Sequence, residues 1–395
     1  MSSEKASLKK VSSENEMRWD SGRVRLERPG KGQRDLRAWD AADPQLIEQA
    51  MARLAAGRDD KPRVAILEDS FGALTLALER FDPVSVADSA LLRQSVAINA
   101  RLNGLEAPPI ADWLAPPEGP FDLVVLKIPR QVDYLDYLLR WANVNLAPDG
   151  VLVAGGMIKH VPARCAQLFE NVMASNEPQR AHRKARVILA CRGSAVLAGW
   201  DGLWSGFALP SGSQSPGGTQ NLRALPAVFA RDQLDIGSRE FLPHVVTAVR
   251  SMAAGARILD LGCGNGVLGL QALTERTDVE VDFADVSSQA VASARENSRQ
   301  AGVSERARFH HTDAVPEGER YDLILCNPPF HEGGTVGDHI ALRMFRQSAK
   351  ALSKQGQLLV VGNRHLAYHV KLRNSFSQVR QLGASPKFVV FACRH

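Results

Sequence analysis

The sequence predicts an α/β protein with two tandem domains, each a doubly wound parallel sheet with helices on both faces. Three observations support this prediction. The chain has 395 residues, enough for two or three domains of about 150 residues. Short β-rich runs alternate with longer segments of helical period. The second half of the chain also repeats the order of the first half, which indicates a duplicated domain.

The repeat pairs four segments in the same order and at nearly constant spacing. Residues 257–270 resemble residues 63–76 when Gly266 is aligned with Gly72. The other pairs are 321–326 with 121–126, 355–360 with 149–154, and 392–394 with 190–192. Four ordered matches are improbable by chance, so we expect two copies, roughly over residues 60–195 and 225–395.

The second copy shows the alternation of strands and helices most clearly. Its β-rich runs predict strands at residues 258–261, 281–284, 307–311, 323–326, 358–361 and 388–391. Helical periodicity predicts helices at residues 267–273, 287–300 and 339–352. Strands that alternate with helices in this way are typical of a parallel sheet.

The segment between the copies, residues 196–224, is expected to contain a hairpin and a linker. Residues 211–220 are dominated by Gly, Ser and Pro, which is typical of a flexible connection. Residues 195–209 alternate in character and contain Trp200 and Trp204. We therefore expect a hairpin there, packed between the two domains.

Composition narrows the class of protein. The net charge is +5 and the pI is about 9.0, which is compatible with nucleic-acid binding without proving it. No apolar run approaches the ~18 residues of a membrane span. The polar start lacks the apolar core of a secretory signal, so a cytoplasmic protein is expected, with residues 1–35 disordered. The five cysteines are scattered, which argues against a disulfide framework and a zinc site.

A glycine-rich loop, residues 260–266 (DLGCGNG), lies where the first strand of the second copy gives way to a helix. Glycines let a ligand approach the backbone, and the helix N-terminus offers N–H groups. Ligands bind at this end of the strands in open α/β sheets. The dinucleotide fingerprint has its third glycine one residue later, where Val267 stands, so a nicotinamide cofactor is disfavoured. The candidate cofactor ligands in the loop are Asp260, Gly262, Gly264, Asn265 and Gly266.

Two further carboxylates follow the next two strands. Asp285 ends the strand that begins at Val281. A carboxylate there can accept hydrogen bonds from both ribose hydroxyls of an adenosine cofactor, although a residue that caps the next helix is an equal alternative. Asp313 follows the strand at 307–311 and is a candidate for binding the adenine amine, the alternative being a solvent-exposed loop residue.

The motif NPPF at residues 327–330 follows the strand at 323–326. Its prolines lack N–H donors and stiffen the chain, so the amide oxygen of Asn327 and the nearby carbonyls become fixed acceptors. Acceptors that hold both hydrogens of a ring-conjugated amine favour the geometry in which its lone pair attacks a sulfonium methyl group. Phe330 would stack on the base, which must leave its helix to enter. The candidate catalytic residues are Asn327, Pro328, Pro329 and Phe330; a rigid turn is the alternative.

The two motifs together resemble those of class I S-adenosylmethionine-dependent methyltransferases that modify exocyclic amines. Residues 228–237, 327–331 and 362–368 are similar to the small methyltransferase family of ribosomal RNA guanine-N2 enzymes, and residues 37–43 and 66–74 to its large-subunit (23S) branch. The resemblance covers nearly the whole chain after residue 35. It implies two Rossmann-like domains, S-adenosylmethionine as cofactor, 23S ribosomal RNA as partner, and neither metal nor membrane.

The resemblance also implies that the first copy, residues 36–195, is degenerate and that residues 225–395 form the catalytic domain. The replacements are Ile66, Glu68 and Ser70 for Asp260, Gly262 and Gly264, and KIPR at 127–130 for NPPF. A copy without the glycines and the acceptor pair should be inactive. We expect it to bind RNA, with Arg130 and the cluster at 182–186 as candidate phosphate contacts.

Three functions are compatible with these residues. The first is methylation of the N2 amine of a guanine in 23S ribosomal RNA. The second keeps the chemistry but moves it to an adenine N6 amine or a protein glutamine amide, since related Asn-Pro-Pro motifs serve both. The third is a non-catalytic RNA-binding protein of ribosome assembly. A methyl-transfer assay separates the third function from the other two.

Overall fold

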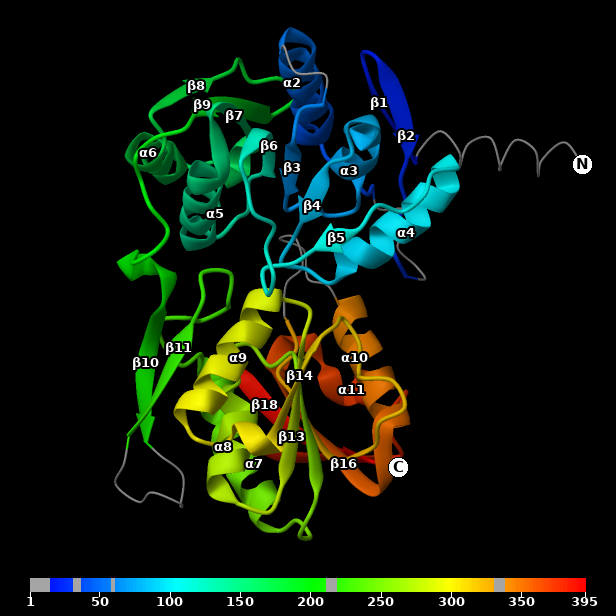
Figure 1. Ribbon diagram of the computed structural model, residues 1–395. Coiled ribbons are helices and arrows are strands. Elements are labelled where there is room, and N and C mark those ends of the chain that lie inside the picture. Colours follow the sequence, from blue (N-terminus) through cyan, green and yellow to red (C-terminus); the bar gives the residue numbers. More distant parts are fainter. Residues whose placement is uncertain (1–14, 31–36, 58–60, 211–218, 330–337) are drawn as a thin grey trace, which may run out of the picture. The chain divides into compact units, whose positions relative to one another are not determined.

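The computed structural model describes residues 15–30, 37–57, 61–210, 219–329 and 338–395 (Figure 1). The chain divides into two units, Met1–Leu203 and Trp204–His395. Each unit contains one seven-stranded sheet and its own helices. The predicted α/β class and the duplication are confirmed.

The second unit holds the predicted chemistry. Its elements in chain order are β10 (Ser205–Pro210), β11 (Thr219–Ala224), α7 (Ile236–Arg250), β12 (Arg257–Leu261), α8 (Val267–Glu275), β13 (Glu280–Asp285), α9 (Ser288–Gln300), η4 (Ser304–Arg306), β14 (Ala307–His311), β15 (Tyr321–Cys326), α10 (Asp338–Ala351), β16 (Leu352–Asn363), η5 (Arg364–Leu366), α11 (Tyr368–Leu372), β17 (Gln378–Ala384) and β18 (Phe388–Arg394). The sheet order is β14-β13-β12-β15-β16-β18-β17.

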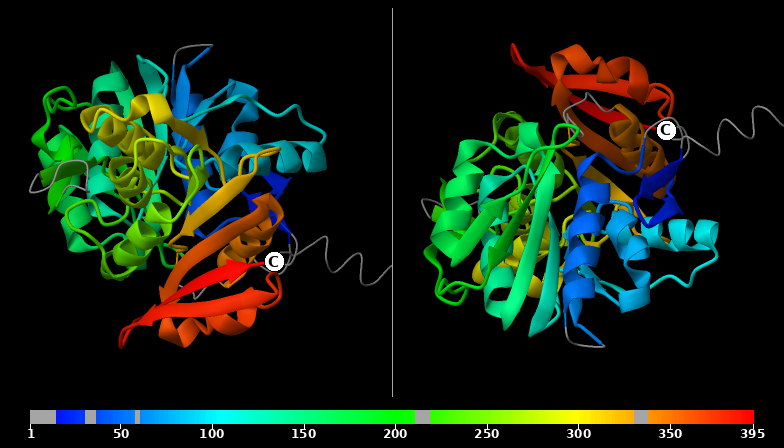
Figure 2. Two further views of the ribbon diagram at one scale, coloured as in Figure 1. Left: turned by 90° about the horizontal axis from the view of Figure 1, so that it is seen from below. Right: turned by 90° about the horizontal axis from the view of Figure 1, so that it is seen from above.

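The central strands of this sheet are largely buried because both of their faces are covered. Successive side chains of a strand point to opposite faces. Ile258 and Leu323 therefore pack in one core with α7, α8 and α9. Their neighbours Leu259 and Ile324 pack in a second core with α10 and α11. Figure 2 shows the same sheet from two further directions.

The expectation of a purely parallel sheet is wrong in one respect. Strands β12 to β16 pair in parallel, but β18 runs antiparallel to both β16 and β17. Only three residues, 385–387, connect β17 to β18, and so short a connection joins antiparallel neighbours rather than a crossover. The prediction also omitted β17, which has few apolar residues.

The first unit repeats this architecture. Its elements are β1 (Glu16–Trp19), β2 (Gly22–Arg25), α2 (Ala42–Ala56), β3 (Val64–Leu67), α3 (Ala73–Ala77), η1 (Glu79–Phe81), β4 (Val84–Val86), α4 (Leu91–Asn103), β5 (Ile110–Ala111), β6 (Phe121–Lys127), α5 (Val132–Asn145), β7 (Leu146–Met157), η2 (Ile158–His160), α6 (Ala163–Val172), β8 (Ser175–Pro178), β9 (Ala185–Cys191) and η3 (Asp201–Leu203). The order β5-β4-β3-β6-β7-β9-β8 matches the second sheet strand by strand.

The expectation that residues 1–35 are disordered is wrong for its described part. Strands β1 and β2 form an antiparallel hairpin. Met17, Val24 and Leu26 are buried in the core of the first unit. Only alternate residues of these short strands are apolar, so the charged residues between them dominate the composition and hide the pattern.

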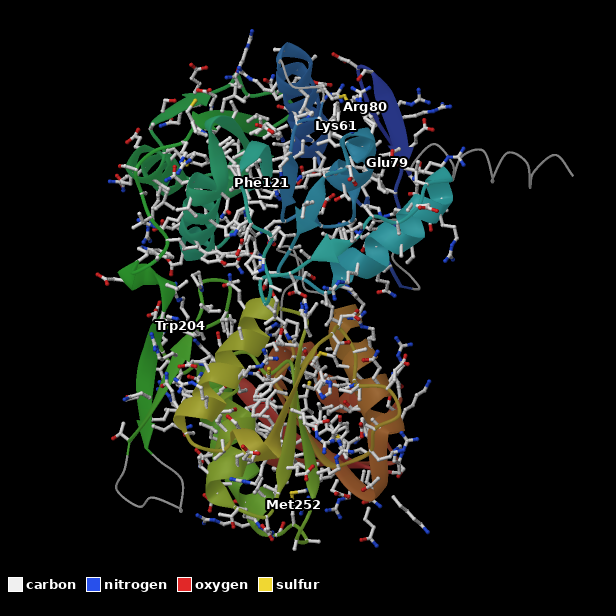
Figure 3. The ribbon with its side chains drawn as sticks, in the orientation of Figure 1. Lys61, Glu79, Arg80, Phe121, Trp204 and Met252 are labelled. Atoms are coloured by element: carbon white, nitrogen blue, oxygen red, sulfur yellow. The ribbon has the colours of Figure 1, made fainter. Side chains whose placement is uncertain are left out.

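The expected hairpin lies further along the chain than 195–209. Strand β10 pairs antiparallel with β11, across the Gly- and Ser-rich segment. The hairpin belongs to the second unit: the backbone of Arg223 in β11 exchanges hydrogen bonds with the amide of Asn297 in α9 (2.9 and 2.8 Å). The guanidinium of Arg223 lies over the ring of Trp204, which is labelled in Figure 3.

Within the described ranges, no helix is long and apolar enough to cross a bilayer. No three His, Cys, Asp or Glu side chains among the same residues lie close enough to share a metal ion.

Candidate active site

The carboxyl ends of four parallel strands bring the predicted site residues to one edge of the second sheet. Leu261 of β12 lies beside Ala284 of β13 and Cys326 of β15. The glycine loop, Asp285 and Asn327 follow these positions directly. Asp285 in turn pairs with the end of β14, which places Asp313 beside it along the edge. Phe330 lies outside the described residues.

The glycine loop takes backbone conformations that other residues rarely adopt. Gly262, Gly264 and Gly266 have φ of +75°, +55° and +84°. A Cβ at Gly266 would lie 3.0 Å from Cβ of Ala294 in α9, so this glycine is needed for close packing. At Gly264 no atom lies within 4 Å of that position. The loop therefore has open space beside Gly264, where a ligand can approach its backbone.

Asp285 ties the glycine loop to the start of α9. Its Oδ2 accepts from the Gly264 N–H and its Oδ1 from the Ser287 N–H, both at 2.9 Å. The N-cap of α9 is supplied by the Ser287 hydroxyl, which accepts from the Ala290 N–H. Ser287 is thus the main cap of α9, the role that was the alternative for Asp285. The Asp285 carboxylate lies half-buried at the loop.

Asp260 is fully buried beneath the loop. Its Oδ2 accepts from the Gly269 N–H of α8 at 2.9 Å, while its Oδ1 has no hydrogen-bond partner among the described residues. Burial raises the pKa of this carboxyl to about 8, and the nearby Asp285 adds to the rise, whereas the Gly269 hydrogen bond opposes it. Asp260 therefore joins the end of β12 to α8 beneath the glycine loop.

The raised pKa of Asp260 predicts a pH effect on stability. The folded-state pKa of about 8 exceeds the ordinary value of 3.8, so the wild-type free energy of unfolding falls as pH rises between these values. Asp260→Asn mimics the neutral carboxyl and lacks this dependence. We expect the melting temperature of the variant, relative to wild type, to rise from pH 5 to pH 9 in thermal unfolding. A difference that is constant across this range would contradict the prediction.

Asn327 is held by the start of helix α7. Its Nδ2 donates to Asp235 Oδ2 (3.2 Å) and to Ser238 Oγ (3.1 Å). Its Oδ1 is buried and has no donor among the described residues. Pro328 is buried and Pro329 exposed. The strand end therefore holds a buried amide oxygen that accepts no hydrogen bond from the described protein.

Two other predicted ligands have partners within the protein. Asp313 Oδ2 accepts from Arg343 of α10 at 2.6 Å, an ion pair that the sequence did not suggest. Asn265 is buried, and its Oδ1 accepts from the Val267 N–H at 3.3 Å. Both contacts order the edge around the glycine loop.

The matching edge of the first unit is filled by its own side chains. Glu68 has a φ of +62° and stands where the second unit has Gly262. Its carboxyl accepts from Trp113 Nε1 and from the Tyr134 hydroxyl. Burial raises its pKa to about 7, and Asp88 adds to the rise. The strand register places Ala87 where the second unit has Asp285.

Sequence reasoning assigned no role to Asp235 or Ser238. Asp235 is the N-cap of α7 and accepts from the Gly237 and Ser238 N–H groups (2.8 and 2.9 Å). The signal was present, because an aspartate before a segment of helical period predicts an N-cap. That the cap reaches Asn327, 92 residues later, depends on the tertiary fold.

Comparisons with known proteins identify the family of the chain. Residues 14–194 match the family described as RLMG N-terminal domain, and residues 219–392 match the Methyltransferase small domain. The Ribosomal RNA large subunit methyltransferase G of Pseudomonas entomophila is 38% identical over 93% of this chain and 96% of its own. That of Alcanivorax borkumensis is 37% identical over 94% and 95%.

A solved structure shares the fold of the whole chain. It is a T. thermophilus 16S rRNA N2 guanine methyltransferase in complex with AdoMet and guanosine, with a TM-score of 0.75, 22% identity, and coverage of 96% of this chain and 97% of that one. Fold, duplication and identity along nearly the full length lead to one conclusion. The chain belongs to the ribosomal RNA large subunit methyltransferase G family.

Proposed function

We propose that the protein methylates the N2 amine of a guanine in 23S ribosomal RNA, with S-adenosylmethionine as the methyl donor. The observation that carries this proposal is the buried Oδ1 of Asn327, an acceptor without a donor in the described protein. It stands at the strand end next to the glycine loop. A primary amine on a flat ring is the kind of group that would satisfy it.

The cofactor would be held at the glycine loop. Open space beside Gly264 admits its backbone contacts, and Asp285 stands at the strand end where a ribose is bound in such sheets. Asp313, paired with Arg343, would border the adenine. Bound S-adenosylmethionine would supply an electrophilic methyl group.

The chain's own residues would orient the amine. Asn327 Oδ1 and the carbonyl of Pro328 would accept its two hydrogens, so that the nitrogen lone pair points away from both acceptors and toward the cofactor. Pro329 would stiffen this turn, and Phe330 would stack on the base. Burial raises the pKa of the Cys263 and Cys326 thiols above the ordinary value, which disfavours a covalent cysteine route.

The first unit would bind the RNA. Its own cofactor edge is filled by Glu68, yet it keeps a complete sheet and core. A large folded RNA requires more contact area than one catalytic edge supplies. We also place the protein in the cytoplasm, with the RNA.

Radiolabelled methyl transfer tests the proposal directly. Purified protein is incubated with 23S ribosomal RNA and labelled S-adenosylmethionine, and the labelled nucleotide is mapped and hydrolysed for identification. We expect N2-methylguanine at one position. Label on an adenine or on protein, or no label in free RNA and assembled subunits alike, would overturn the proposal.

A further inference from the structure

The amide of Asn327 can be oriented in two ways, and only one of them presents an acceptor. Rotation by half a turn would exchange Oδ1 and Nδ2 with almost no change in shape. If Nδ2 faced the substrate, a donor of Asn327 would meet the donor N–H groups of the target amine, and the two groups would repel each other. Something must therefore determine which end of the amide faces the substrate.

Asp235 determines the orientation of the Asn327 amide. An ionised carboxylate accepts hydrogen bonds and cannot donate them, so it favours the amide orientation in which Nδ2 of Asn327 faces Asp235 Oδ2. Ser238 Oγ takes the second hydrogen of the same Nδ2 at 3.1 Å. Asp235 is the N-cap of α7 and Ser238 lies in its first turn, where Asp235 also accepts two backbone N–H groups. The amide is thereby anchored to a helix end.

The first unit contains a similar arrangement, which we call the clamp: acceptor side chains at the start of a helix hold the donor atoms of the side chain at the strand end. In the first unit that side chain is a lysine. Lys127, at the strand position that matches Asn327, donates from Nζ to Asp40 Oδ1 (2.7 Å) and Asp43 Oδ1 (2.6 Å). These carboxylates lie at the start of α2, the helix that precedes the first strand of that sheet. Both units thus hold the strand-end side chain by its donors. A lysine has no acceptor to offer, so the clamp persists in the first unit where the acceptor is lost.

We propose that Asp235 and Ser238 are positioning residues that keep Asn327 Oδ1 turned toward the target amine. This proposal rests on the proposed function for one point, the identity of the target amine. Asp235→Asn is the sharpest test, since asparagine caps helices about as well as aspartate. Its own amide can offer an N–H to residue 327, which turns that amide around.

The experiment compares Asp235→Asn, Ser238→Ala and the control Glu240→Gln in the full chain. Glu240 is exposed on the same helix and its replacement removes the same charge. We expect kcat to fall about 10- to 100-fold in Asp235→Asn, less in Ser238→Ala, and not in the control. The Kd for S-adenosylmethionine should stay within about twofold of wild type, since neither residue is assigned to the cofactor.

A second readout separates positioning from a structural role. Guanosine and inosine, which lacks the amine, are compared as competitive inhibitors of RNA methylation. Wild type should prefer guanosine by about fivefold, roughly the value of one hydrogen bond, and Asp235→Asn should lose this preference. Unchanged kcat and preference in Asp235→Asn and Ser238→Ala overturn the clamp. A wild type without the preference overturns the guanine assignment instead.

An independent observation concerns a turn in the first unit. Arg183 and Lys184 have φ of +47° and +62°. The backbone of His182 and Ala185 on either side exchanges two hydrogen bonds (3.0 and 2.9 Å). Two central residues of positive φ define a type I′ turn, which strongly favours Asn-Gly. Two long cationic residues therefore occupy positions that cost them backbone free energy.

We call residues 180–186 the basic turn, because this segment is positively charged and contains no residue that would neutralise the charge. It contains Arg180, His182, Arg183, Lys184 and Arg186, all exposed, and no acidic residue. None of its Arg and Lys side chains pairs with a carboxylate of the described chain. Its backbone is fixed, because the His182 carbonyl accepts from Gln45 of α2 and the Lys184 carbonyl from the Ile158 N–H.

We infer that the basic turn contacts RNA phosphates, an inference that rests on the RNA substrate proposed above. Strained backbone that the surrounding structure holds in place is typical of binding sites. The double variant Arg183→Asn/Lys184→Gly installs the favoured turn. It should melt at a higher temperature than wild type but bind 23S ribosomal RNA more weakly.

The measurements are thermal unfolding and RNA affinity over a range of salt. We expect the slope of log K against log salt to decrease by about 1.5 for two lost phosphate contacts. The control Arg53→Gln/Arg101→Gln removes two exposed charges from the ends of α2 and α4 in the same unit. Unchanged RNA affinity in the double variant, or an equal loss in the control, overturns the inference. Methylation at saturating RNA by the double variant shows that the enzyme itself is intact.

Discussion

Asn327→Ala is expected to bind S-adenosylmethionine nearly as wild type does and to lose most of its turnover. The side chain is held by Asp235 and Ser238 and leaves its Oδ1 without a donor. No described contact links it to the glycine loop. Loss of one preorganised hydrogen-bonding group commonly costs about 10²-fold or more in rate.

Two measurements check this separation of binding from chemistry. Calorimetry reports the cofactor Kd, and labelled methyl transfer to 23S ribosomal RNA reports kcat. Lys127→Ala serves as the matched control, because Lys127 occupies the same strand end in the first unit. Turnover that survives Asn327→Ala would show that NPPF is a structural turn.

Asp285→Ala is expected to abolish measurable cofactor binding, and the wild-type chain is expected to bind one cofactor, not two. The substitution removes the carboxylate that holds Gly264 and Ser287 together. It also removes the proposed ribose contact. Hydrogen bonds to a charged group contribute about 1.5–3 kcal/mol each, so a loss of two weakens binding by at least about 10²-fold.

The first unit provides the contrast for this prediction. Ala87 stands at the position of Asp285, and Glu68 fills the edge where a cofactor would lie. Asp88→Ala should therefore leave both stoichiometry and affinity unchanged in a calorimetric titration. Two sites of similar affinity, or binding lost in Asp88→Ala rather than in Asp285→Ala, would contradict the assignment.

Much of the architecture was determined by local patterns in the sequence. Local patterns predicted six strands of the second unit, and five of them agree with the structure to within a few residues. The sixth, β16, begins earlier than predicted. The DLGCGNG and NPPF motifs each came at the end of such a strand. Since carboxyl ends of parallel strands meet at one edge, their proximity followed from chain order alone. The duplication was also legible, because both copies keep the same order of motifs.

Tertiary structure alone decided the rest. The antiparallel direction of β18 depends on a short connection and on the neighbour it pairs with, and neither has a periodicity of its own. The hairpin at residues 16–25 is stabilised by burying Met17 and Val24 against distant residues. The hydrogen bond that Asn327 donates to Asp235 joins a strand end to a helix cap 92 residues away. Local sequence predicts the helix cap and the strand end separately. Only the packing of α7 against the sheet brings Asp235 and Asn327 within hydrogen-bonding distance.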